Sequence, residues 1–154
     1  MDAPTNHRFL GEEEHLRAMA DTHLESARRL VSDGQRLLTN AFFLVRMAAE
    51  CLLKHLYCML RLAQGSRADR AATVKPARSW GHDAKRLGGV LIREQEVRRS
   101  RALEAVVRLF PSGTAWNEAR YAPPSKDETV EAFDEFEGWV LKLMEDIDTG
   151  VEDV

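Results

Sequence analysis

The chain has 154 residues, of which 44% are hydrophobic and 31% are charged, a composition typical of a single globular domain. It has no run of about 18 uncharged apolar residues and no hydrophobic signal core near its start, which predicts a cytoplasmic protein without a membrane span. The net charge of −3 conceals a basic middle, because residues 61–108 hold 12 basic and 5 acidic residues. This segment either binds phosphates or pairs with its acidic flanks.

The first half of the chain predicts two helices. Residues 12–32 carry apolar side chains three and four positions apart, and the dipeptide Asp33-Gly34 is a natural end to that helix. Residues 35–63 form the longest and most apolar segment, which predicts a helix at the centre of a bundle.

The second half predicts two or three shorter helices after a long polar loop at 64–79. We expect a third helix from about residue 82, capped by Ser79 or Gly81, and a fourth at 97–110. The last helix should start at a capping box of Ser125 and Glu128. Residues 1–154 are thus predicted to form one all-α domain, an up-and-down bundle of four to five helices at 12–147 with an acidic tail at 148–154.

The central helix carries a narrow polar strip. Arg46, Glu50 and Lys54 follow one another at i, i+4 and i+8, within 80° of the helix circumference. The strip is either a solvated face with i, i+4 ion pairs or a buried strip covered by another helix. If the strip is buried, Glu50 needs a cationic partner, because an unpaired carboxylate in the interior costs on the order of several kcal/mol. The candidate partners are Lys54, Arg46 and the more distant Arg120, which we favour.

Three segments in order resemble the HEPN family of helical nucleotide-binding domains. AECLLKHLY (49–57) is similar to the Glu-x-x-x-Lys core of that family, WGHDAKRL (80–87) to its His-Asp segment and WNEARYAP (116–123) to its aromatic, Arg-Tyr and Pro segment. The resemblance spans residues 12–147. It implies a helical bundle that often forms homodimers, with members that are ribonucleases of toxin–antitoxin and defence systems and others that accompany nucleotidyltransferases.

The sequence departs from the nuclease members of that family. Their Arg-x4–6-His motif lies near the last helices, whereas the last histidine here is His82. We therefore predict no catalytic residue and expect a binding or accessory module for a nucleotide, RNA or a partner enzyme. The alternatives are a divergent metal-independent ribonuclease and a purely structural dimerisation module. Dimer contacts are expected through Phe43, Tyr57 or Trp139.

The candidate binding residues lie in the second and third of these segments. They are His82, Asp83, Trp116, Asn117, Arg120 and Tyr121. The His82-Asp83 pair is either a site or a helix cap, and Trp116 with Arg120 and Tyr121 either stacks on a base or forms a buried aromatic corner. Cys51 and Cys58 are two helical turns apart, too far for a disulfide. No metal-ligand spacing is present, so no metal or cofactor is predicted.

Overall fold

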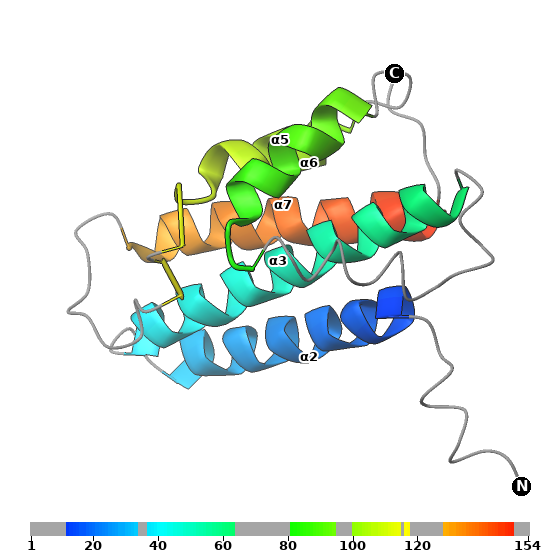
Figure 1. Cartoon of the computed structure of the whole chain (residues 1–154). Coiled ribbons are helices and arrows are strands. Elements are labelled where there is room, and N and C mark those ends of the chain that lie inside the picture. The colour runs from blue at the N-terminus through cyan, green and yellow to red at the C-terminus, as the bar shows by residue number, and fades with distance from the viewer. Residues whose placement is uncertain are drawn as a thin grey trace, which may run out of the picture.

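The computed structural model describes residues 12–33, 37–63, 81–94, 100–114, 116–117 and 128–149. Their regular structure is five α-helices, which are α2 (Glu12–Asp33), α3 (Leu38–Ala63), α5 (Ala84–Glu94), α6 (Arg101–Leu109) and α7 (Val130–Thr149) (Figure 1). Within these ranges no strand occurs. The predicted all-α bundle is thereby confirmed. The predicted loop at 64–79 lies outside the described residues.

Helix α3 occupies the centre of the bundle. It runs antiparallel to α2 and also packs against α5 and α7, while α6 packs on α5 and α7 (Figure 1). Its apolar circumference is the reason, because a helix without a wide polar face is stable only when neighbours cover it. The largest fully buried side chains come from α3, α5, α7 and from α6 with its C-cap residue, and include Leu52, Leu53, Leu87, Leu103, Phe110 and Phe133.

Two helices, α6 and α7, begin later than predicted, because short polar side chains set their starts. Ser100 has extended backbone and its Oγ accepts from the backbone N–H of Leu103 at 3.1 Å, so the fourth helix starts at Arg101 and the prediction of residue 97 is wrong. Thr129 Oγ1 accepts from the backbone N–H of Ala132 at 3.0 Å and caps α7. The predicted capping box is therefore wrong for Glu128, whose carboxylate contacts α3 instead. Ser125 lies outside the described residues.

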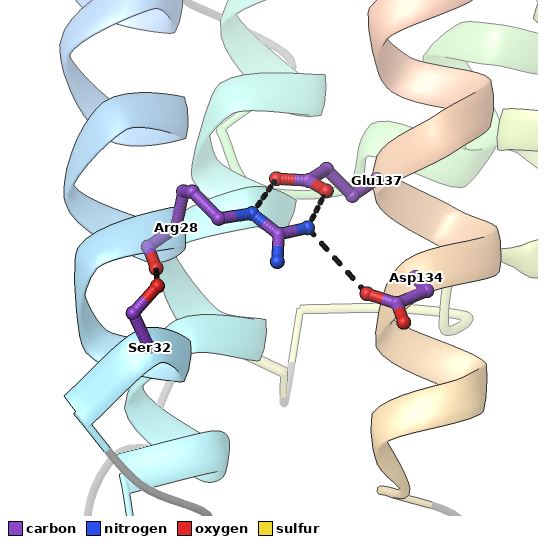
Figure 2. Close-up of polar contacts among 4 residues, drawn as sticks. All are labelled: Arg28, Ser32, Asp134 and Glu137. Atoms are coloured by element: carbon purple, nitrogen blue, oxygen red, sulfur yellow. Dashed lines mark hydrogen bonds and ion pairs between the residues drawn. The ribbon is translucent and has the colours of Figure 1, made fainter.

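A clamp of charged residues ties α2 to α7. Arg28 of α2 donates from Nε to Glu137 Oε2 at 3.2 Å, donates from Nη2 to Glu137 Oε1, and lies 3.4 Å from Asp134 Oδ1 (Figure 2). Two parallel bonds from one guanidinium fix the orientation of the carboxylate as well as neutralising it. Glu137 is 7% exposed and so takes its counter-charge from a helix 109 positions away in sequence.

The end of α7 is held in the same way. Arg17 of α2 lies 2.6 Å from the carboxylate of Asp148. Helix α7 continues to Thr149, so the predicted acidic tail starting at residue 148 is wrong for its first two residues. The rest of that tail lies outside the described residues. None of the helices in the described ranges is long and apolar enough to cross a membrane.

Candidate functional site

The centre of the site is the carboxylate of Glu50, which is only 4% exposed. Lys54 Nζ donates to Glu50 Oε2 at 2.7 Å from the next turn of α3, and His82 Nδ1 lies 2.9 Å from Glu50 Oε1. The solvated-strip interpretation is therefore wrong for Glu50 and Lys54, whose side chains are 5% and 14% exposed. Two elements, α3 and the turn before α5, meet at this one carboxylate.

Arg46, the third member of the strip, belongs to a different pair. Its Nη1 lies 3.4 Å from Glu128 Oε2, and Thr39 Oγ1 donates to Glu128 Oε1 at 3.0 Å. The guanidinium also lies over the ring of Phe42, 4.9 Å from its centroid. Burial lowers the pKa of Arg46, while the charge of Glu128 acts in the opposite direction. Arg46 as a partner of Glu50 is therefore a wrong prediction, whereas Arg120 lies outside the described residues.

His82 reaches Glu50 because its backbone is held from both sides. Gly81 precedes it with φ +55°, a left-handed conformation that favours glycine. Asp83 follows as the N-cap of α5, where its Oδ1 accepts from the backbone N–H of Arg86 at 3.3 Å. Asp83 is thus the cap of this helix, not Gly81. Lys85 Nζ donates to the backbone carbonyls of Arg108 and Phe110, which ties the same turn to the end of α6.

Trp116 packs against His82, and its own ring is covered by neighbouring side chains. Its Nε1 donates to the backbone carbonyl of His82 at 2.7 Å, and its ring stands edge-on to the imidazole with centroids 5.9 Å apart. The indole also packs against Phe43 and Phe110 and is 4% exposed. The buried-corner alternative is correct for Trp116, and its prediction as a binding residue is wrong, because a covered ring cannot stack on a base.

The remaining candidates are less closely tied to Glu50. Asn117 is half-buried, and its backbone N–H donates to the carbonyl of Thr114 at 3.1 Å. Arg120 and Tyr121 lie outside the described residues. Of the expected dimer anchors, Tyr57 is buried within this chain, and its prediction as an exposed contact is wrong. Phe43 packs on Trp116, and Trp139 is half-buried.

Two further groups near Glu50 were missed or undervalued by sequence reasoning. His23 of α2 has its Nε2 buried without a hydrogen-bond partner among the described residues. Burial lowers the pKa of His23, and the negative charge of Glu50 partly opposes this shift. Burial also raises the pKa of the Cys51 thiol to about 12, with Glu50 adding to the rise, so Cys51 is a protonated packing residue at neutral pH. Only helix packing places His23 near Glu50, so the sequence held no signal for it.

The arrangement leaves the imidazole of His82 partly open to solvent. An ionised carboxylate only accepts hydrogen bonds, so Nδ1 of His82 carries the proton shared with Glu50. The nitrogen that this contact leaves for other chemistry is Nε2. The His82 side chain is 42% exposed, in contrast to its two partners in the cluster. Such an imidazole can donate to an anion when protonated or accept a proton when neutral.

Comparison with known proteins finds no match: no family model fits the chain, and neither the curated proteins nor the solved structures include a significant similarity. Within the described residues, no three His, Cys, Asp or Glu side chains converge as a metal site would require.

Proposed function

We propose that this protein is a HEPN-like helical binding module whose ligand carries a phosphate, as a nucleotide or RNA does, and that His82 contacts that phosphate. The observation that carries the proposal is the contact of His82 Nδ1 with the buried Glu50, at 2.9 Å, in an imidazole that is 42% exposed. A side chain held rigidly at one end and open to solvent at the other is the usual form of a binding group.

The charges of the cluster favour an anion. Lys54 already neutralises Glu50 through a 2.7 Å ion pair, so protonation of His82 gives the cluster a net positive charge. Its Nε2–H can then donate a charge-assisted hydrogen bond to a phosphate oxygen. The same chain segment supplies Lys85 and Arg86, which follow His82 within the first turn of α5.

The test is equilibrium binding of fluorescein-labelled single-stranded RNA and of labelled ATP, measured by anisotropy in EDTA. We expect His82→Ala to weaken binding roughly 10- to 100-fold, the effect of losing one charge-assisted hydrogen bond. His15→Ala is the matched control, because His15 is an exposed histidine on α2. Equal affinities of the wild type, His82→Ala and His15→Ala would refute the proposal.

A divergent metal-independent ribonuclease is the second candidate, and the Glu50–His82 pair is the observation that favours it. A carboxylate at Nδ1 holds the neutral imidazole with Nε2 ready to accept a proton, as a general base requires. In this reaction Nε2 removes the proton of an RNA 2′-hydroxyl, whose oxygen attacks the adjacent phosphorus. The 5′-oxygen of the next nucleotide leaves and takes a proton from water, which gives a 2′,3′-cyclic phosphate end.

Binding and cleavage are separated by following the length and the ends of the RNA. If the second candidate holds, wild-type protein forms cyclic phosphate ends in EDTA, and Glu50→Gln lowers the rate by a factor on the order of 10² or more. If the chain is a binding module, the RNA remains intact while His82→Ala still weakens its binding.

The wider context is proposed from the resemblance to the HEPN family alone. A HEPN-like module of this kind would act as a homodimer or beside a nucleotidyltransferase-type partner in a toxin–antitoxin or defence system. A purely structural dimerisation module would bind no nucleotide, and both His82→Ala and the wild type would then leave the anisotropy unchanged.

A further inference from the structure

A separate open groove of about 610 Å³ lies over α5, α6 and α7. Its apolar lining comes from Ile92, Ala105, Val107 and Trp139. Ala105 and Val107 are buried, whereas Ile92 and Trp139 are half-buried. Because Ala105 and Val107 are nearly covered, the apolar surface that a ligand could contact comes mainly from Ile92 and Trp139.

The charged lining of the groove alternates along α6. Arg101, Glu104 and Arg108 are exposed and follow one another at i, i+3 and i+7 on the outer face of that helix. The two arginines are therefore about 10 Å apart along the helix axis, with a carboxylate between them. A positive, negative, positive row beside an apolar hollow is complementary to a second helix with the reverse order of charges.

We infer that this groove binds an amphipathic helix of another protein, with acidic residues seven positions apart and a basic residue between them. The apolar face of that helix would place a large side chain against Ile92 and Trp139. Its acidic residues would meet Arg101 and Arg108, and its basic residue would meet Glu104. Arg and Trp are the residue types that most often dominate the energy of such contacts.

The charges of Arg101, Glu104 and Arg108 fit nucleic acid and a second copy of this chain less well than such a helix. Nucleic acid would bring its phosphates against Glu104 as well as against the arginines. A second copy joined by a two-fold contact through α6 would place one net-positive row against another. The exposed Leu141 of α7 offers no alternative, because it lies two residues from Trp139 and thus about 200° away around the helix.

The experiment uses synthetic helical peptides of roughly 20 residues, long enough to be helical in water when rich in alanine. One carries Leu anchors with an acidic, basic, acidic row, and its partner has the same anchors with every charge reversed. We expect saturable binding of the first peptide by anisotropy. Trp139→Ala should weaken it about tenfold or more. The triple variant Arg101→Glu/Glu104→Arg/Arg108→Glu should also weaken it and should bind the charge-reversed peptide instead, as expected for complementary rows.

The triple charge variant alters exposed side chains only, so it tests the groove even if Trp139→Ala fails to fold. His82→Ala should bind the peptide as the wild type does, which separates this inference from the proposed phosphate site. Peptide binding that neither variant changes would overturn the inference, and so would an absence of saturation. A dimer that Trp139→Ala converts to a monomer, or RNA binding that Trp139→Ala abolishes, would assign the groove to a second copy or to nucleic acid and overturn it equally.

Discussion

Two buried carboxylates, Glu50 on α3 and Glu137 on α7, differ in the cations that neutralise them. They are 4% and 7% exposed, so burial does not distinguish them. Glu137 takes two bonds from one guanidinium, which is permanently charged, and the result is a tie between helices (Figure 2). Glu50 divides its two oxygens between a lysine and a histidine, and the histidine can change its charge. The first arrangement ties two helices together, and the second contains the one side chain among them that can gain or lose a proton near neutral pH.

The largest expected effect is at Glu50. Glu50→Gln should lower the free energy of unfolding by about 3 kcal/mol, since it leaves the ammonium of Lys54, whose side chain is only 14% exposed, without a counter-charge. Lys54→Met should recover much of the loss when combined with it, because the uncompensated charge is then removed. The measurement is a urea melt of each variant. Glu25→Gln is the control, an exposed carboxylate in an i, i+4 pair with Arg29, and should cost under about 0.5 kcal/mol.

Gly88→Ala should disturb the packing of α5, the helix that follows His82, and leave the Arg28–Glu137 pair unchanged. A Cβ at Gly88 would overlap Cγ2 of Val107, a stiff and buried side chain, so α5 would have to move. We expect a loss of about 1–3 kcal/mol, the usual cost of overpacking. At the adjacent Gly89 the nearest atom is Arg93 Nη1 at 3.8 Å, so Gly89→Ala should instead gain up to about 1 kcal/mol. Denaturant melts in which both variants behaved alike would show that α5 and α6 are not closely packed.

Glu137→Gln should cost less stability than Glu50→Gln. The partner Arg28 is 47% exposed, so its charge remains solvated after the change, and the loss should be about 1–2 kcal/mol, between surface and buried pairs. Glu135→Gln on the exposed face of α7 is the control. RNA binding by Glu137→Gln should equal that of the wild type. A loss larger than that of Glu50→Gln would reverse the ranking of the two carboxylates.

The smallest effect is the pH dependence contributed by His23. The pKa of His23 is lowered from its ordinary value of 6.5 in the folded protein, so the unfolded chain binds this proton more readily. The contribution to stability is present above about pH 6.5 and is lost as the pH falls through the lower folded pKa. We expect under about 1 kcal/mol, because His23 is only partly buried. Chemical melts between pH 7.5 and pH 5.5 should show a smaller loss for His23→Gln than for the wild type. Identical slopes would contradict this assignment.

Local sequence signals determined most of the helices. Apolar spacing placed α2 at 12–32, within one residue of its observed end, and the apolar segment before Ala63 marked α3 as the central helix. Local polar groups set two other boundaries that were predicted wrongly. Periodicity placed the start of α6 too early, and for α7 the wrong capping residue was chosen; Ser100 and Thr129 cap these helices through a single side-chain oxygen each. Both residues are of types that favour the N-cap position, so the sequence contained the signal that predicts these two starts.

The sequence determined the all-helical fold and the central place of α3. It also placed two cations, Arg46 and Lys54, one turn to either side of Glu50, but it did not choose between them. Three contacts depend on how the helices pack. His82, 32 positions away in sequence, takes the second oxygen of Glu50. Arg46 pairs with Glu128 rather than with Glu50, and Arg28 pairs with Glu137. The physical reason is that a buried charge needs a partner, but the packing of helices sets which of several equally charged residues comes within bonding distance.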